Sequence, residues 1–151
     1  QSFLHGRLNI GEPISIPIIR ELKKRINKDL PVILDCPPGA SCSVVQSLED
    51  CDYCILVTEP TPFGLHDLKI AVALVKKMGI PFGVIVNKAT ENQRMIQDFC
   101  KENEIGILME IPFSRKIAEK YSKGILPVQD NPEWIKRFQE VYAKVERGVN
   151  Q

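Results

Sequence analysis

The sequence predicts an α/β fold in which a mostly parallel sheet is flanked by helices. Short apolar runs of strand length alternate with segments of helical period almost from end to end. Runs such as 31–34 and 82–86 are apolar at nearly every position, which is typical of strands buried on both faces of a parallel sheet. The chain has 151 residues, of which 44% are hydrophobic, so we expect one α/β domain over residues 1–151.

The first third of the chain predicts two helices and one strand. Ser15 can cap a helix whose first turn contains Pro17. An apolar stripe follows at helical spacing, made of Ile18, Ile19, Leu22 and Ile26. The apolar run 31–34 predicts a short buried strand that ends at Asp35, and a helical stretch follows over about 43–48.

The middle of the chain predicts two further strands around a long helix. The second strand covers 53–58 and runs into a turn rich in Pro and Gly over 59–64. Apolar residues then recur at helical spacing, at Leu65, Leu68, Val72, Val75 and Met78. Gly79 is placed to end this helix, and the Val- and Ile-rich run 82–86 predicts the third strand.

A helix and a fourth strand follow. Thr90 and Gln93 form a capping-box pair that opens the helix. Its buried face is expected to comprise Met95, Ile96, Phe99 and Cys100. The fourth strand covers 107–111 and is closed by Pro112.

Two helices are predicted at the C-terminal end. A short one starts at Ser114 and ends before Gly124, and the last one opens at Asn131–Pro132. The last helix carries an apolar face made of Trp134, Phe138, Val141, Tyr142 and Val145. Its basic residues are diluted by glutamates, so packing on the sheet is favoured over binding to a membrane surface.

The composition gives no reason to expect nucleic acid or a membrane as a partner. The 20 basic and 19 acidic residues leave a net charge of +1. The longest apolar runs are of strand length, far below the roughly 20 residues of a membrane-spanning helix. The N-terminus does not have the layout of a signal peptide, and we therefore expect a cytoplasmic protein.

The five cysteines do not predict a disulfide framework or a metal site. Cys51 and Cys54 have C-x-x-C spacing, but no second pair follows to complete a four-ligand set. Cys36 and Cys42 flank Gly39 and are expected to be small packing residues.

The segment Asp35-Cys36-Pro37-Pro38-Gly39 is the strongest functional signal in the chain. Ligands of open α/β sheets lie at the carboxyl ends of the strands. A carboxylate at that place, Asp35, can hold a hydrated magnesium ion. The backbone N–H of Gly39 can approach a phosphate because no Cβ is in the way. The segment predicts one half of a nucleoside triphosphate site.

Asn87-Lys88, directly after a predicted strand, indicates a base-reading element. In guanine-specific proteins an aspartate two residues after the lysine accepts the guanine N–H groups, but Thr90 occupies that position here. An asparagine can both accept from the adenine amine and donate to a ring nitrogen. Adenine is therefore favoured over guanine, although Asn87-Lys88 could also be a polar turn.

The phosphate-binding loop G-x-x-x-x-G-K-[S/T] does not occur in the chain. Gly6 and Gly11 have the right spacing, but Glu12 and Pro13 stand where lysine and a hydroxyl residue are needed. A carboxylate would repel a phosphate, and proline lacks an N–H donor. A dinucleotide-binding Rossmann enzyme is disfavoured too, because G-x-G-x-x-G does not follow any strand.

Several ordered blocks resemble the MinD/ParA/Mrp superfamily of ATPases, which are P-loop NTPases of the SIMIBI type. The blocks are Asp35–Gly39, Val57–Thr61, Gly64–Leu68, Asn87–Lys88 and Ile111–Phe113. The segment His5–Glu12 is similar to the sequence that follows the inserted ferredoxin domain in one MinD-like group.

The resemblance implies a role for each matching residue. Asp35 would be the Walker B carboxylate that holds magnesium through water, and Gly39, preceded by Pro38, would contact the γ-phosphate and lead the switch segment. Asn87 would read adenine, with Pro112 and Phe113 packed near the base. ATP would be sandwiched in a homodimer, and the iron–sulfur clusters would belong to the ferredoxin segment.

The resemblance covers about residues 5–128 and leaves out the family's phosphate loop, so the chain is expected to be the C-terminal portion of such an ATPase. Alone it is expected to be inactive towards ATP, because the phosphates would lack their cradle. The missing strand predicts an open sheet edge that favours an oligomeric contact or a rearranged sheet. The alternative is a non-catalytic α/β module for regulation or protein contacts.

Overall fold

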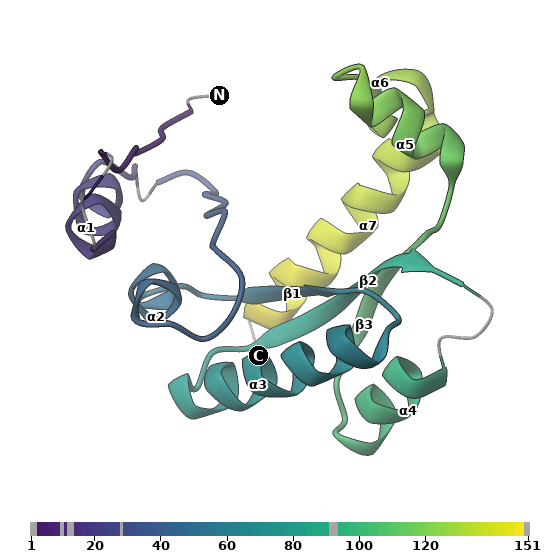
Figure 1. The fold of residues 1–151 in the computed structure, drawn as a ribbon, viewed down its shortest axis with the longest axis horizontal. Helices are drawn as coiled ribbons and strands as arrows, with labels where there is room; N and C mark the ends of the chain where they lie inside the picture. Colours follow the sequence, from purple (N-terminus) through teal and green to yellow (C-terminus); the bar gives the residue numbers. More distant parts are fainter. Residues whose placement is uncertain (1–2, 10, 12–13, 28, 91–93, 150–151) are drawn as a thin grey trace. The chain divides into compact units, whose positions relative to one another are not determined.

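The computed structural model describes residues 3–9, 11, 14–27, 29–90 and 94–149 (Figure 1). The chain forms two compact units, Gln1–Cys51 and Asp52–Gln151. The strands of the described residues all belong to the second unit, whereas the first unit contributes helices and irregular segments.

The first unit contains two helices, α1 (Ile16–Lys24) and α2 (Cys42–Leu48). Side chains of α1 bind α2: the Arg20 guanidinium donates to Gln46 Oε1 at 2.9 Å, and Lys23 Nζ donates to the carbonyls of Gln46 and Ser47 at 3.3 Å each. Lys23 thereby satisfies carbonyl groups at the end of α2 that have no partner within the helix. Ser15 precedes α1 as predicted, but its side chain makes no capping hydrogen bond.

The predicted strand over 31–35 is wrong, because this segment has no regular secondary structure. Val32 and Ile33 are exposed, Ile33 by 95%. A strand exists only through hydrogen bonds to a neighbouring strand, and none of the described residues pairs with this segment. An apolar sequence of strand length is therefore not sufficient for a strand when the described residues offer it no partner.

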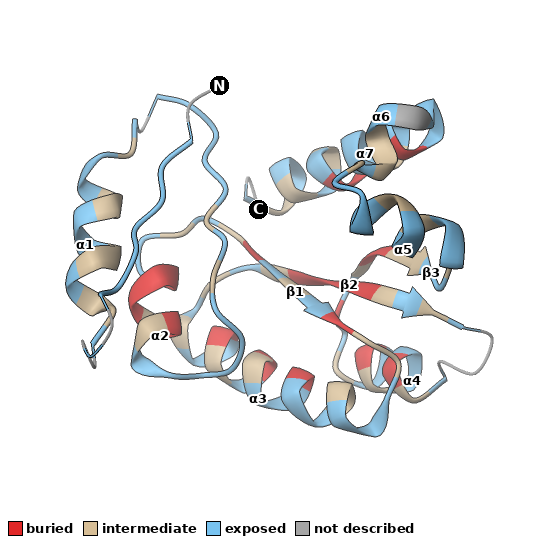
Figure 2. Cartoon of the chain, turned by 45° about the horizontal axis from the view of Figure 1, so that its top comes forward, coloured by how far each residue is buried: buried red, intermediate tan, exposed pale blue. Residues whose placement is uncertain are grey.

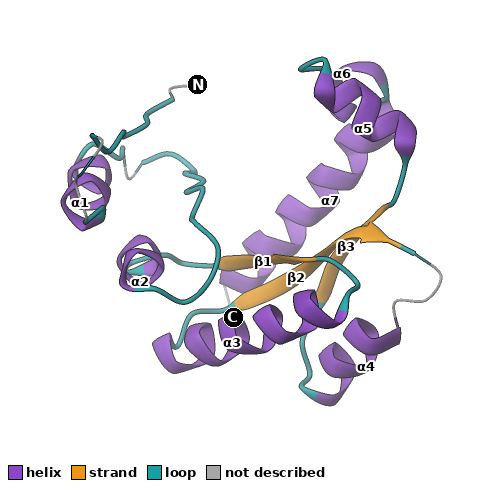
Figure 3. Cartoon of the chain, viewed as in Figure 1, coloured by secondary structure: helices purple, strands orange, loops and turns teal. Residues whose placement is uncertain are grey.

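The second unit is a three-stranded parallel sheet with helices on both faces (Figure 3). The strands stand in the order β1 (Cys54–Thr58), β2 (Phe82–Ala89) and β3 (Ile107–Pro112). The helices are α3 (Pro62–Met78), α4 (Arg94–Glu102), α5 (Arg115–Ser122), α6 (Pro127–Asp130) and α7 (Pro132–Val149). These elements confirm the α/β class and the three strands predicted in this part of the chain.

Two apolar cores lie on opposite faces of the sheet, and successive side chains of β2 alternate between them. Val84 and Val86 of β2 face one core, and Ile85 faces the other. The first core includes Leu68 and Val72 of α3, Ile96 and Cys100 of α4, and Ile105. The second core includes Leu108 and Met109 of β3 with Trp134 and Val141 of α7. The buried residues lie along the strands and the inward sides of the helices (Figure 2).

Several helix boundaries follow the sequence signals, but α3 begins at Pro62, inside the turn predicted over 59–64. Thr61 caps α3 by accepting from the Gly64 N–H at 2.9 Å, and Gly79 ends the helix at φ +70°. Ser114 caps α5, since its hydroxyl accepts from the Ile117 N–H at 3.4 Å. The short helix α6 was missed, and the Thr90–Gln93 capping box cannot be compared because Gln93 lies outside the described residues.

The two edges of the sheet differ. Along β3, side chains of α7 cover the outer carbonyls: Lys144 Nζ donates to Leu108 O at 2.7 Å, and Arg137 donates to Glu110 O. The Arg137 guanidinium also lies 4.7 Å from the centre of the Trp134 ring. Along β1, no described residue pairs with the outer edge, and Val57 is 64% exposed. Among the described residues, side chains of α7 therefore occupy two carbonyls of β3, whereas the outer side of β1 has no strand partner.

Candidate functional site

The parallel strands bring three polar or aromatic segments to one edge of the sheet in the second unit. Because β1, β2 and β3 are parallel, their carboxyl ends lie at the same edge. These ends carry Thr58-Glu59, Asn87-Lys88 and Pro112-Phe113. Three predicted site residues, Asn87, Pro112 and Phe113, therefore lie in one region.

A β-bulge sets the direction of Asn87. In the pairing of β2 with β3, Val86 stands opposite Glu110 and Ala89 stands opposite Pro112. Two residues of β2, Asn87 and Lys88, thus face a single residue of β3. Bulges are rare in parallel sheets and frequent next to active sites, where they redirect a side chain.

The bulge has an unusual backbone. Lys88 adopts a φ of +52°, in the left-handed region that residues with a Cβ seldom occupy. Its N–H donates to Asn87 Oδ1 at 3.0 Å. A carbonyl oxygen can accept two hydrogen bonds, so Oδ1 keeps capacity for a second donor, and the Asn87 amide also has two N–H groups to donate. The half-buried Asn87 can offer both an acceptor and a donor to a ligand.

An ion pair joins the bulge to the neighbouring strand. Lys88 Nζ lies 2.7 Å from Glu59 Oε1, and both side chains are about half exposed. The Glu59 carbonyl accepts from the Thr61 N–H at 2.8 Å. The buried Thr58 hydroxyl donates to Gly64 O at 3.0 Å. The turn between β1 and α3 is therefore held in place beneath the ion pair.

The aromatic residue of this edge is exposed. The Phe113 N–H donates to Ala89 O at 3.0 Å, which continues the β2–β3 pairing just past Pro112. The Phe113 side chain is 62% exposed, so its ring is available to stack on a flat ligand. Together the edge offers an amide for hydrogen bonds and an aromatic ring for apolar contact.

The remaining predicted site residues lie in the first unit, immediately before α2. Asp35, Pro38 and Gly39 are all exposed. Gly39 has φ +93°, a backbone conformation that favours glycine, and a Cβ at this position would meet no atom within 4 Å. The segment is therefore an open loop with an exposed carboxylate at its start.

Cys36 is a packing residue of this loop. It is half-buried, and burial raises the pKa of its thiol above the ordinary value of 9.0, while a hydrogen bond to the Ser47 side chain acts in the opposite direction. The raised pKa keeps the thiol protonated at neutral pH, which does not favour a nucleophile. Cys42, by contrast, is exposed, so the prediction of a packing role fails for it.

The acidic residues suit a magnesium ion only in company with phosphates. Within the described ranges, no three His, Cys, Asp or Glu side chains are grouped to hold a metal. Magnesium usually keeps several waters and binds through one or two carboxylates together with substrate phosphates. A single exposed Asp35 fits that kind of site, and the cysteines of the described residues do not fit a cluster site.

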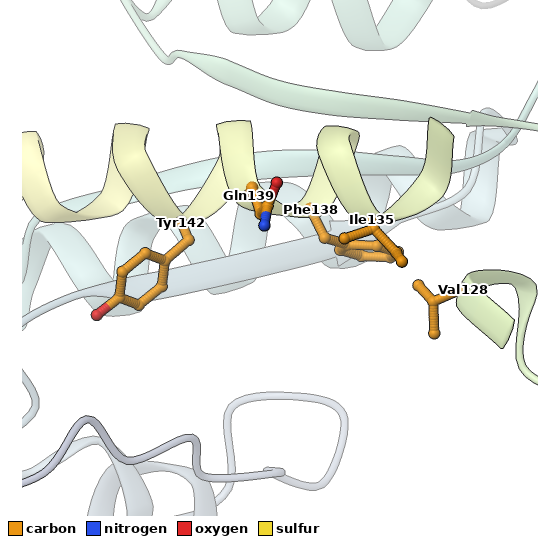
Figure 4. Close-up of a pocket in the computed structure, with 5 residues that line it drawn as sticks. All are labelled: Val128, Ile135, Phe138, Gln139 and Tyr142. Carbon is orange, nitrogen blue, oxygen red and sulfur yellow. The ribbon is translucent and has the colours of Figure 1, made fainter. Parts of the chain in front are cut away.

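An apolar hollow of about 450 Å³ lies over α7 (Figure 4). It is lined by Val128, Ile135, Phe138, Gln139 and Tyr142. A second hollow shares Val128 and Phe138 and reaches Ile111 of β3. The predicted site residues in the described part of the chain do not line either hollow. The lining of the first hollow is apolar apart from Gln139 and Tyr142.

Comparison with known proteins supports the predicted relationship. The chain matches no protein-family model. It is 36% identical over 121 residues to an uncharacterized protein of Methanocaldococcus jannaschii, covering 79% of this chain and 42% of that protein. In the same organism, an uncharacterized ATP-binding protein is 28% identical over 133 residues (85% and 51% covered). An iron-sulfur cluster carrier protein is 27% identical over 135 residues (76% and 47% covered).

Solved structures agree in fold. The cell division ATPase MinD of Pyrococcus furiosus superposes with a TM-score of 0.67 at 25% identity, covering 90% of this chain and 59% of that one. By sequence and fold, the chain is a relative of the MinD/ParA/Mrp superfamily. The MinD protein of Aquifex aeolicus, at 20% identity and a TM-score of 0.63, shows the same fold. This MinD-like chain spans about half the length of the curated relatives it matches.

The sequence missed the Glu59–Lys88 pair and the bulge beneath it. The sequence did predict that both residues lie just past strand ends, at the edge of the sheet where ligands bind. The ion pair itself depends on β1 and β2 being neighbours, and the bulge depends on the register of β2 with β3.

None of the helices among the described residues has the length and apolar composition that a membrane-spanning helix requires.

Proposed function

We propose that residues 1–151 form the C-terminal portion of a MinD-like ATP-binding domain and supply its base-recognition and Walker B/switch segments. One observation carries the proposal: the sheet brings Asn87 together with Pro112 and Phe113 at its carboxyl edge. The relatives support ATP as the ligand, since one is described as an ATP-binding protein.

Each predicted residue has a role that its setting supports. The Asn87 amide accepts from the adenine amine and donates to a ring nitrogen, while Phe113 and Pro112 contact the base. Asp35 would hold magnesium, and the N–H of Gly39, after Pro38, would meet the γ-phosphate. When bound, magnesium would neutralise charge on the phosphates.

The phosphate loop would come from a part of the domain outside these 151 residues. The open edge of β1 and the unpaired apolar segment 31–34 support this, since each lacks a neighbouring strand among the described residues. The complete domain would bind and hydrolyse ATP as a homodimer in the cytoplasm. We further propose a link to iron–sulfur chemistry, supported by the relative described as an iron-sulfur cluster carrier protein.

A titration of the ¹⁵N-labelled chain with ATP and with GTP tests base recognition. We expect ATP to shift the signals of Asn87 and Phe113 and GTP to shift them less. Asn87→Asp should reverse this order, because a carboxylate accepts from the two guanine N–H groups and donates nothing to adenine. Equal shifts with both nucleotides, in the chain and in the variant, would contradict base recognition by Asn87.

The second candidate is a non-catalytic α/β module for regulation or protein contacts. The observation that favours it is the lack of a phosphate-loop sequence in the chain. The same titration separates the two functions, because a module without a nucleotide site gives no shift at Asn87 or Phe113 with either nucleotide.

A further inference from the structure

Glu59 links the ends of two neighbouring strands through its side chain. It directly follows β1, and its carboxylate meets Lys88 Nζ of the β2 bulge at 2.7 Å. Among the described salt bridges, the other two lie within α1 or between it and the next residue, and they join residues three or four positions apart. The Glu59–Lys88 pair instead spans the carboxyl edge of the sheet.

Lys88 restrains the neighbouring Asn87 side chain through its backbone N–H. Its backbone has a φ of +52°, a conformation that persists only when neighbouring groups support it. Its N–H donates to Asn87 Oδ1 at 3.0 Å, so the position of Lys88 sets the direction of the Asn87 amide. A Lys88 side chain fixed at its far end restrains the bulge from one side, and the Ala89–Pro112 pairing restrains it from the other.

Glu59 is itself a firm anchor. The Thr61 N–H donates to its carbonyl at 2.8 Å, and the buried Thr58 hydroxyl lies within 3.4 Å of the same oxygen. Gly64 also lies against this carbonyl, since a Cβ on Gly64 would come within 2.3 Å of it. The start of α3 thus fixes the backbone from which the Glu59 carboxylate extends.

We propose that Glu59 is a positioning residue for base recognition, which acts through Lys88 to hold the Asn87 amide in its reading orientation. This inference rests on the proposed nucleotide function, and it assigns part of the preference for adenine to a residue that does not touch the base. Loss of the pair leaves Asn87 present but less firmly oriented, so discrimination between ATP and GTP weakens.

The first test uses the nucleotide-free chain. The variants are Glu59→Gln and the charge exchange Glu59→Lys with Lys88→Glu, and Glu21→Gln is the matched control, since Glu21 forms an exposed pair with Arg25 in the other unit. Hydrogen exchange of the Lys88 amide and the side-chain amide signals of Asn87 are followed by NMR. We expect Glu59→Gln to speed this exchange about two- to fivefold, as an exposed ion pair allows. The charge exchange should restore the slow rate, and Glu21→Gln should leave it unchanged.

Salt provides a measurement without any substitution. Raising the ionic strength to about 1 M shortens the screening length to roughly 3 Å, close to the 2.7 Å separation of the pair, and should shift the signals of the unaltered chain in the same direction as Glu59→Gln but by less. If the Asn87 and Lys88 signals respond neither to Glu59→Gln nor to salt, the positioning role is overturned.

The second test adds nucleotide and separates this inference from the proposed function. We expect Glu59→Gln to reduce the ratio of ATP to GTP affinity about two- to fivefold, with restoration by the charge exchange. If no form of the chain binds ATP or GTP, the proposed function fails, whereas restraint of Asn87 by Glu59 is still decided by the exchange rates. If ATP binds and its preference over GTP is the same in Glu59→Gln, the specificity role fails alone.

Discussion

Gly64 shows how a single missing Cβ shapes the candidate site. A Cβ there would lie 2.3 Å from the Glu59 carbonyl oxygen and 3.1 Å from Thr58 Oγ1. The first distance is to backbone, which cannot rotate away. Glycine is therefore required because α3 begins against the turn that carries Glu59, and the turn and the helix form one rigid corner.

We expect Gly64→Ala to destabilise the second unit by about 1–3 kcal/mol, the usual cost of forcing an extra carbon into a packed site. Urea unfolding followed by circular dichroism measures the change. Gly106→Ala is the matched control, because a Cβ at Gly106 meets no atom within 4 Å. Equal stability of the two variants would show that the corner relaxes without cost.

Cys100 is expected to lower the stability of the folded chain at alkaline pH. Its side chain is only 1% exposed, and burial raises the pKa of its thiol above the ordinary value of 9.0. Above pH 9 the unfolded chain loses this proton while the folded chain keeps it, so unfolding becomes more favourable as pH rises. Stability from this group is complete below pH 9 and falls above it, by at most about 1.4 kcal/mol per pH unit.

Urea unfolding of the chain and of Cys100→Ala between pH 7 and pH 10 checks this dependence. The variant is expected to be less stable at every pH because it leaves a cavity. Its stability should nevertheless fall less steeply above pH 9. Parallel curves for the two proteins would assign the pH dependence to other groups, such as Tyr53, whose phenol pKa burial also raises.

At the scale of elements, α3 is fixed by its first turn. The Thr61 hydroxyl accepts from the Gly64 N–H at 2.9 Å, whereas Ser15 before α1 makes no such bond. We expect Thr61→Ala to cost about 0.5–2 kcal/mol, the range for loss of a capping side chain. Ser15→Ala should be near neutral in the same unfolding assay. A similar cost for both would mean that capping is not the origin of the Thr61 effect.

The two hydrogen bonds from α7 to carbonyls of β3 are expected to limit pairing of this strand with a further strand. Lys144 and Arg137 bind two carbonyls that would otherwise face a further strand. We expect Lys144→Met with Arg137→Met to increase self-association, measured by analytical ultracentrifugation at several concentrations. Lys136→Met, on the exposed side of the same helix, is the control. An unchanged sedimentation profile in the double variant would refute a protective role.

At the scale of the whole molecule, the local sequence predicted a strand correctly only where another segment of the chain pairs with it. The run 82–86 became the central strand because β1 and β3 lie on either side of it. The run 31–34 has the same apolar pattern and stays irregular, since pairing is a property of two segments and the signal lies in only one of them. The bulge at Asn87-Lys88 was hidden for a similar reason, because only the register against β3 reveals the extra residue.

Adding a phosphate loop to the chain tests the proposed function at the scale of the whole molecule. The chain alone is expected not to hydrolyse ATP, whereas joining it to a segment that carries a phosphate loop should give magnesium-dependent turnover. Asp35→Asn in the joined protein should reduce that turnover at least about tenfold, if the carboxylate orients the metal. Phosphate release measures both. Full turnover in Asp35→Asn would remove Asp35 from the site.

The covered edge at β3 and the bare edge at β1 also determine what kind of assembly the chain can build. An open-ended filament needs two different complementary surfaces on each subunit, so that every addition exposes a fresh one. When two copies join through β1 about a twofold axis, the outermost strand on both sides is β3, which Lys144 and Arg137 already occupy. If residues 1–151 pair in this way, we expect growth by strand addition to stop at two copies, because each outer β3 strand already has two carbonyls bound by α7.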